Sequence, residues 1–178
     1  MDETFGALGR DALAETVGQL CRLHGAFTLR SGAVASTYFD KYLFEAEPEV
    51  LRAIADRLAV IVPTETEVLA GLELGGVPVA TALSLVTGLP AAFVRKDAKP
   101  YGTAKLAEGA QIDGRRVLIV EDVITTGGQV VASTEQLRSR GADVGSVLCV
   151  IDRSDGEHRL LEDAGLEVIS LFTHHDLM

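Results

Sequence analysis

With 178 residues, the chain is long enough to form one ordinary domain with a full hydrophobic core. Hydrophobic residues make up 47% of the sequence and charged residues 24%, which excludes a mainly disordered or fibrous chain. The formal net charge of −10 argues against a general nucleic-acid or membrane-surface binder.

Two cysteines, Cys21 and Cys149, are too few for a disulfide framework, and neither stands in a C-x-x-C or Cys/His cluster. We interpret both as small core residues in a reducing compartment. The N-terminus carries the acidic residues Asp2 and Glu3, and no apolar run reaches membrane-spanning length. These features predict a cytoplasmic protein that binds neither membranes nor nucleic acid.

The first two dozen residues have apolar side chains at three- and four-residue intervals, which predicts an amphipathic helix that stops at Gly25. Two short β-prone runs follow at residues 27–29 and 37–39, on either side of a glycine-containing turn. This pattern predicts a small antiparallel hairpin outside the central sheet. We expect it to form a hood drawn mainly from residues 1–42.

Residues 48–61 predict a second helix, because Pro48 suits a first helical position and the apolar residues after it repeat with helical spacing. The run at residues 68–72 predicts a buried strand, and a glycine turn separates it from a helix at residues 78–87. A further strand is predicted at residues 91–94. It leads into a long connection without a clean apolar period, which is typical of a functional loop.

The most informative stretch is residues 116–129, which read R-V-L-I-V-E-D-V-I-T-T-G-G-Q. Its apolar run predicts a strand buried on both faces of a parallel sheet, followed by the adjacent carboxylates Glu121 and Asp122. Ligands of open α/β sheets bind beyond the carboxyl ends of such strands, so both carboxylates are expected at the binding edge. The turn at residues 125–128 then opens a helix, whose first N–H groups attract an anion.

One ligand suits both halves of this stretch, namely a sugar phosphate. Its ring hydroxyls would pair with the carboxylates, and its phosphate would enter the glycine turn, where the backbone can approach an anion closely. The alternative is a structural strand-to-helix turn whose acidic pair is simply solvated.

The last part of the chain continues the alternation of strands and helices. Strands are predicted at residues 145–151 and 166–172, with a short helix at residues 158–164 between them. We therefore expect an α/β fold, a Rossmann-like parallel sheet flanked by helices and doubly wound.

The stretch at residues 116–129 resembles the phosphoribosyl pyrophosphate (PRPP) signature of type I phosphoribosyltransferases, a hydrophobic run followed by E/D-D and a T-T/S/A-G turn. Neither G-x-x-x-x-G-K-[ST] nor G-x-G-x-x-G occurs in the chain. Two further motifs narrow the resemblance to the orotate phosphoribosyltransferase family. Residues 95–102 read R-K-D-A-K-P-Y-G, where the family has R-K-E-A-K-D-H/Y-G, and residues 27–32 read F-T-L-R-S-G, where the family has F-x-L-K/R-S-G.

This resemblance implies one phosphoribosyltransferase domain over residues 1–178, with the type I phosphoribosyltransferase fold and a small N-terminal hood. It implies transfer of phosphoribose from PRPP to orotate, giving orotidine 5′-phosphate and pyrophosphate in de novo pyrimidine biosynthesis. Mg²⁺ is the implied cofactor, bound mainly through the substrate rather than directly by the protein. The implied assembly is a homodimer with shared active sites. The alternatives are a purine or xanthine phosphoribosyltransferase and a non-catalytic PRPP-sensing regulator.

The resemblance also assigns roles to individual residues. The implied catalytic residues are Lys99, Glu121 and Asp122, and the implied pyrophosphate loop consists of Leu74, Gly75 and Gly76. The residues expected to contact orotate are Tyr38, Phe39, Thr125 and Arg153. The residues expected to contact PRPP are Arg30, Arg95, Lys96, Lys99, Tyr101, Glu121, Asp122, Val123, Ile124, Thr125, Thr126, Gly127, Gly128 and Gln129.

Some of these assignments have simpler alternatives. The basic loop that begins at Arg95 can be a solvated face, and Arg153 can be a surface arginine paired with Asp152 or Asp155. The four histidines show no ligand spacing, and His174 is expected at the surface.

One departure from the family stands at Glu73. Many bacterial members carry tyrosine and lysine before the glycine of the pyrophosphate loop, whereas this chain has glutamate and leucine, so a lysine contact is missing. Backbone N–H groups of the loop can still form an anion nest, but the Glu73 carboxylate would oppose pyrophosphate unless a cation intervenes. The alternative is a glycine turn with Glu73 facing solvent or meeting Mg²⁺ indirectly.

Overall fold

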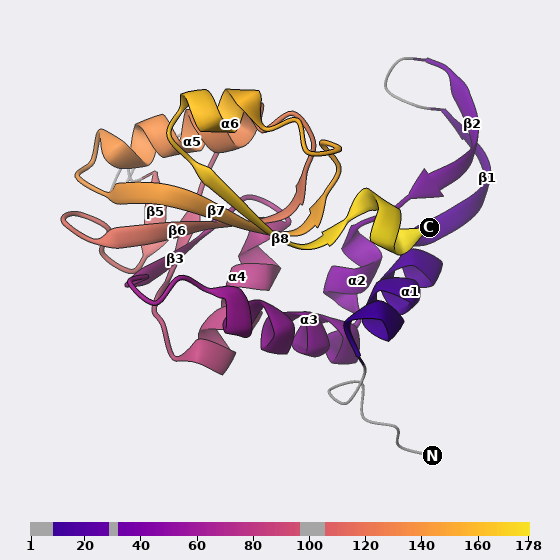
Figure 1. The fold of residues 1–178 in the computed structure, drawn as a ribbon, viewed down its shortest axis with the longest axis horizontal. Helices are drawn as coiled ribbons and strands as arrows, with labels where there is room; N and C mark the ends of the chain where they lie inside the picture. The colour runs from indigo at the N-terminus through magenta and orange to yellow at the C-terminus, as the bar shows by residue number, and fades with distance from the viewer. Residues whose placement is uncertain (1–8, 29–31, 97–105) are drawn as a thin grey trace.

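The computed structural model describes residues 9–28, 32–96 and 106–178. Within them, a six-stranded sheet has the order β5-β4-β3-β6-β7-β8, and a separate two-stranded sheet pairs β1 with β2 (Figure 1). The strands of the larger sheet are β3 (Val68–Leu72), β4 (Ala91–Val94), β5 (Ala107–Gly109), β6 (Arg116–Ile124), β7 (Asp143–Asp152) and β8 (Glu167–Thr173).

Five neighbouring strands of this sheet, β4, β3, β6, β7 and β8, are parallel, as the sequence predicts. One edge of the sheet carries an additional strand that the sequence did not predict, β5, which pairs antiparallel with β4. This three-residue strand, A-E-G, is too short to show an alternating pattern. The strand order reverses direction between β3 and β6, and ligands of open α/β sheets bind at such a switch point.

Helices cover both faces of the sheet (Figure 1). On one face lie α3 (Pro48–Ile61) and α4 (Gly76–Thr87), and on the other lie α5 (Gly128–Arg138) and α6 (Arg159–Asp163). Alternate strand residues enter two separate cores. Leu118 belongs to the core that includes residues of α3 and α4, whereas its neighbour Ile119 belongs to the core that includes Leu161 of α6. Burial on both faces explains why these strands are continuous apolar runs.

The predicted hood is present as an antiparallel hairpin of β1 (Arg22–Thr28) and β2 (Val34–Phe39), which projects away from the main sheet (Figure 1). The first helix, α1 (Arg10–Cys21), ends earlier than predicted, because β1 already begins at Arg22. Gly25 therefore lies in a strand, at an irregularity of the β1–β2 register between His24 and Phe27. Two short helices were not predicted: α2 (Tyr42–Ala46) after the hood and the 3₁₀ helix η2 (His174–Leu177) after β8.

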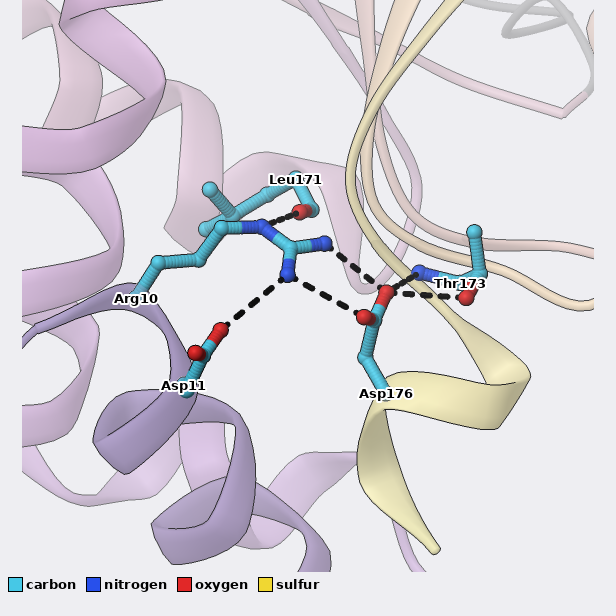
Figure 2. Close-up of polar contacts among 5 residues, drawn as sticks. All are labelled: Arg10, Asp11, Leu171, Thr173 and Asp176. Atoms are coloured by element: carbon cyan, nitrogen blue, oxygen red, sulfur yellow. Dashed lines mark hydrogen bonds and ion pairs between the residues drawn. The ribbon is translucent and has the colours of Figure 1, made fainter.

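The two ends of the described chain are joined by a clamp centred on Arg10 and Asp176 (Figure 2). The Arg10 guanidinium donates to both carboxylate oxygens of Asp176, at 3.1 and 2.8 Å, and its Nε donates to the carbonyl of Leu171. Asp176 also accepts from the backbone N–H and the hydroxyl of Thr173, which caps η2. Gly18 makes the approach of α1 to η2 possible, because a Cβ there would lie 2.5 Å from the Leu177 carbonyl oxygen.

Replacing Asp176 with alanine is expected to lower the free energy of unfolding by about 1 to 2 kcal/mol at pH 7, through loss of a helix cap and a charged hydrogen bond. Hydrogen bonding to Arg10 and to the Thr173 N–H lowers the pKa of Asp176 below its usual value. Its contribution is therefore present above about pH 4 and lost as the pH falls further. Urea unfolding at pH 7 and pH 3 measures both effects.

Asp56→Ala is the matched control for this experiment. Asp56 pairs with Arg52 across one turn of α3, and the Arg52 side chain is 72% exposed. Exposed pairs of this kind contribute little, so unfolding should change by less than about 0.5 kcal/mol. Equal effects of the two substitutions would show that the clamp does not stabilise the fold.

Candidate active site

The two carboxylates of the predicted binding edge lie on β6, next to the switch point. They are inside the strand rather than beyond it, which corrects the expectation that the strand ends before Glu121. The strand continues to Ile124 because Val123 and Ile124 pair with the last residues of β7. The one strand β6 therefore carries both the apolar side chains of the core and the two carboxylates of the candidate site.

Asp122 is fully buried and is held from two sides. Its Oδ1 accepts the N–H of Val123 at 2.7 Å, and its Oδ2 lies 2.5 Å from Nζ of Lys41, which is 34% exposed. The neighbouring Glu121 has a buried Oε2 with no hydrogen-bond partner among the described residues. Burial, reinforced by the charge of Asp122, raises the pKa of Glu121 to about 8, and Lys41 opposes this shift. Glu121 thus keeps a buried oxygen without a hydrogen-bond partner in the described part of the chain, close to Gly76.

The predicted phosphate loop leads from β6 into α5, as expected. Gly127 has a left-handed backbone with φ of 75° and precedes the first helical residue, Gly128. The loop threonines, Thr125 and Thr126, are exposed, so their hydroxyls are accessible to an anion at the helix N-terminus. Ile124, in contrast, has its side chain in the core, so it can serve a ligand only through its backbone.

The predicted pyrophosphate loop packs directly against β6. A Cβ on Gly75 would lie 1.8 Å from Oδ2 of Asp122, and a Cβ on Gly76 would lie 2.3 Å from the Val120 carbonyl oxygen. Leu74 is exposed. These glycines are therefore required by the close contact between the loop and the carboxylate-bearing strand.

Glu73, the departure from the family pattern, has a specific contact. Its Oε1 accepts the backbone N–H of Lys96 at 2.6 Å, and its own N–H donates to Val94. The carboxylate thereby joins the pyrophosphate loop to the start of the basic loop, which the sequence did not predict. Three residues assigned to the site, Arg30, Lys99 and Tyr101, lie outside the described residues.

A pocket of about 190 Å³ lies between the hood and the end of β7. It brings together three of the residues assigned to orotate, Tyr38, Phe39 and Arg153, and the Arg153 guanidinium lies 6.0 Å from the centre of the Phe39 ring. Thr125 is not among its lining residues. The full lining is Arg22, Thr37, Tyr38, Phe39, Arg153, His174 and Leu177.

Neighbouring contacts leave Arg153 available to a ligand. Asp152 bonds instead to Ser154 and to His158, whose Nε2 lies 2.9 Å from the carboxylate. Sequence reasoning missed the contribution of His174 to the pocket, because η2 meets the hood only in the folded structure, where it packs on α1 and where Arg22 of β1 donates to the Leu177 carbonyl.

Lys41 and Glu45 are the other residues near the site that sequence reasoning missed. Both come from the segment that follows the hood, and the pKa of Glu45 is raised to about 8 by burial and by its contact with Asp122. Their i, i+4 spacing places them on one side of a helical turn and is the signal that could have revealed them. Among the described residues, no group of three or more His, Cys, Asp or Glu side chains is arranged to hold a metal ion.

Comparisons with known proteins identify the family of the chain. The family model for the phosphoribosyl transferase domain matches residues 44–171. The chain is 54% identical over 165 residues to an orotate phosphoribosyltransferase of Nocardioides sp., covering 93% of this chain and 92% of that protein. It is 42% identical over 154 residues to the orotate phosphoribosyltransferase of Methanocella arvoryzae, covering 86% and 88% of the two chains.

The fold is similar to solved structures of the same family. The orotate phosphoribosyltransferase of Mycobacterium tuberculosis in complex with PRPP aligns with a TM-score of 0.81 and 32% identity, covering 94% of this chain and 98% of that one. No helix in the described ranges is long and apolar enough to cross a membrane. The match of the family model and the identity to relatives along nearly their whole length show that the chain belongs to the orotate phosphoribosyltransferase family.

Proposed function

We propose that the protein transfers phosphoribose from PRPP to orotate and releases pyrophosphate. The observation that carries this proposal is the position of the pocket containing Arg153 and Phe39, next to the end of the strand that bears Glu121 and Asp122. An acceptor in this pocket and a sugar phosphate on the phosphate loop would meet at the carboxylates. The PRPP complex of the M. tuberculosis relative supports the choice of donor.

In this proposal the ribose hydroxyls of PRPP donate to Glu121, beside the fixed Asp122 carboxylate. The 5′-phosphate accepts bonds from the hydroxyls and N–H groups of the loop at residues 125–129, where the positive end of α5 favours an anion. The pyrophosphate lies against residues 74–76 and the basic loop that begins at Arg95. Lys99 would neutralise the leaving group. Positioning, charge stabilisation and exclusion of water then supply the catalysis, and no side-chain nucleophile is needed.

Orotate is expected to use the pocket in two ways. Its carboxylate suits the planar guanidinium of Arg153, which can form two parallel hydrogen bonds with it. Its ring suits the apolar face of Phe39 on the hood, with Tyr38 beside it. The negative charge of orotate lies on its carboxylate, so the ring nitrogen loses its N–H proton to water or to the departing pyrophosphate as the bond to the ribose forms.

We also propose Mg²⁺ as the cofactor, bound mainly through PRPP oxygens and water, as is usual for this ion. When bound, it neutralises pyrophosphate charge. The Glu121 oxygen, without a partner among the residues that the structure describes, and the exposed loop hydroxyls are compatible with such a substrate-held ion. The same proposal includes one domain over residues 1–178, a homodimer with shared active sites and a cytoplasmic location. It also includes PRPP contacts by Arg30, Lys96 and Tyr101.

The direct test supplies purified protein with PRPP and Mg²⁺, together with orotate, guanine or xanthine, and follows consumption of the base. We expect rapid loss of orotate alone. Turnover of guanine or xanthine without orotate would overturn the assignment of the acceptor. Binding of PRPP without turnover of any base would instead indicate a non-catalytic sensor.

Replacing Arg153 with methionine is expected to raise the KM for orotate about 100-fold, since a charged bidentate contact is lost, while PRPP affinity stays near the wild-type value. Steady-state kinetics with each substrate varied in turn separates the two effects. Arg159→Met is the control, because Arg159 is 92% exposed and its pair with Asp163 is long, at 3.9 Å. An unchanged KM for orotate in Arg153→Met would remove Arg153 from base recognition.

A further inference from the structure

A buried cluster of charges lies behind the two site carboxylates, and part of it comes from outside the sequence motifs. Lys41 and Glu45 belong to the segment that follows the hood, whereas Glu121 and Asp122 belong to β6. The Lys41 ammonium lies 2.5 Å from Oδ2 of Asp122, which is fully buried. A cation at this distance from a buried carboxylate largely determines where that carboxylate can lie.

Glu45 faces the same carboxylate from another side. Its Oε1 is buried and has no conventional hydrogen-bond partner within the described ranges. A Cβ built on Gly75 would meet both Oδ2 of Asp122, at 1.8 Å, and Oε1 of Glu45, at 2.8 Å, so the two carboxylates converge on one point beside the pyrophosphate loop. Burial and a side-chain contact with Asp122 both raise the pKa of Glu45, because two buried carboxylates in contact repel each other unless one of them carries a proton.

The charges in the cluster do not balance if every group is ionised. Glu45, Glu121 and Asp122 supply three carboxylates and Lys41 one ammonium. The Cys21 thiol on α1 lies near Glu45, and the Tyr42 ring lies beside the Lys41 ammonium. Burial first, and then the neighbouring carboxylates, raise the pKa values of Glu45 and Glu121 to about 8 each. Because these groups interact, the protons belong to the cluster as a whole.

We propose that Lys41 and Glu45 are positioning residues of the PRPP site: Lys41 fixes the Asp122 carboxylate, and Glu45 shares a proton with it. This arrangement leaves Glu121 as the carboxylate that faces the ribose. It also connects the hood segment to the pyrophosphate loop through Gly75. The inference rests on the proposed function for its identification of the ligand as PRPP.

Binding of Mg²⁺–PRPP, measured by calorimetry from pH 6 to pH 9.5, tests the role of Lys41. Lys41→Met is expected to weaken binding about 10- to 100-fold, because the buried carboxylate loses its fixed cation. Lys41→Arg should restore most of the affinity. Arg52→Met is the matched control and should bind as wild type does, since Arg52 also pairs with a carboxylate but on an exposed helix face. Equal affinities of Lys41→Met and Arg52→Met would overturn the proposal.

Two substitutions of Glu45 test the shared proton. Glu45→Gln keeps an N–H that can donate to Asp122, so at pH 7 it should bind PRPP within about threefold of wild type, whereas Glu45→Ala should bind about tenfold more weakly. As the pH rises through about 8, wild type loses the shared proton and Glu45→Gln does not. The affinity of Glu45→Gln for PRPP should therefore rise relative to that of wild type above about pH 8. Identical behaviour of the glutamine and alanine variants would refute the shared proton.

Thermal unfolding supplies a readout that needs no substrate. The folded-state pKa of Glu45 is raised, so its contribution to stability is present below about pH 4.5 and lost as the pH rises through about 8. Glu45→Gln should therefore lose less stability than wild type between pH 7 and pH 9. If wild type consumed no orotate while these patterns held, the proposed acceptor would be wrong and the positioning roles would stand.

Discussion

Replacing Gly76 with alanine is expected to lower kcat/KM at least about 100-fold, which is the cost of misplacing catalytic groups by about 1 Å. The added Cβ would lie 2.3 Å from the carbonyl oxygen of Val120 and 3.0 Å from Oε2 of Glu121. The first of these atoms is backbone in the middle of the sheet, so β6 cannot retreat without breaking its pairing with β3 and β7. The pyrophosphate loop must move away from the carboxylates instead.

The same substitution should lower the free energy of unfolding by about 1 to 3 kcal/mol, as overpacking usually does. Gly145→Ala in β7 is the control, because a Cβ there meets no atom within 4 Å. It should leave both activity and stability near the wild-type values. Stopped assays with orotate and urea titrations of the two variants make the comparison. Wild-type kinetics in Gly76→Ala would show that the loop does not hold the pyrophosphate close to β6.

Local patterns were sufficient to predict the strands that are continuous apolar runs. Continuous apolar runs identified β3 at residues 68–72 and β4 at residues 91–94 without error in their bounds. Pro48 marked the first residue of α3 correctly. The bounds of such strands follow from where the apolar residues begin and end, and the sequence shows that directly. The pairing of β5, in contrast, depends on backbone hydrogen bonds between a short polar segment and the edge of β4, and no side-chain pattern encodes it.

The candidate site could be predicted only as far as its motifs extend. The phosphate loop and the carboxylates form one continuous stretch, so their proximity follows from chain connectivity. Lys41 reaches Asp122 across 81 positions of sequence, and His174 reaches the hood pocket from the other end of the chain. These contacts are set by how the hood segment and η2 pack on α1, and single-sequence periodicity carries no information about that packing.

Glu73 is a second case in which the sequence indicated an unusual residue but not its contact in the fold. The sequence showed the departure from the family and raised the question of a carboxylate near the proposed pyrophosphate site. It could not show that the Glu73 carboxylate accepts a hydrogen bond from the backbone N–H of Lys96. A hydrogen bond to a backbone donor depends on the relative positions of two loops. The sequence of either loop alone does not predict it. The bond now gives Glu73 a role in holding the start of the basic loop.

Replacing Gly127 with alanine is expected to lower the free energy of unfolding by about 2 to 4 kcal/mol and to weaken PRPP binding about 30-fold. Two effects add at this position. The left-handed backbone, with φ of 75°, disfavours any side chain, and the added Cβ would lie 2.7 Å from Cγ of Leu161, which is buried in the core beneath α6. Relief of that clash must shift the loop to which we assign the 5′-phosphate.

Gly88→Ala separates the two effects. Gly88 caps α4 with nearly the same backbone, φ of 76°, but a Cβ there meets nothing within 4 Å. It should therefore lose about 1 to 2 kcal/mol through backbone strain alone and keep its affinity for PRPP. The difference in unfolding free energy between the two variants measures the contact with Leu161. If both variants lose equal stability and Gly127→Ala still binds PRPP normally, α6 has no part in holding the phosphate loop in place.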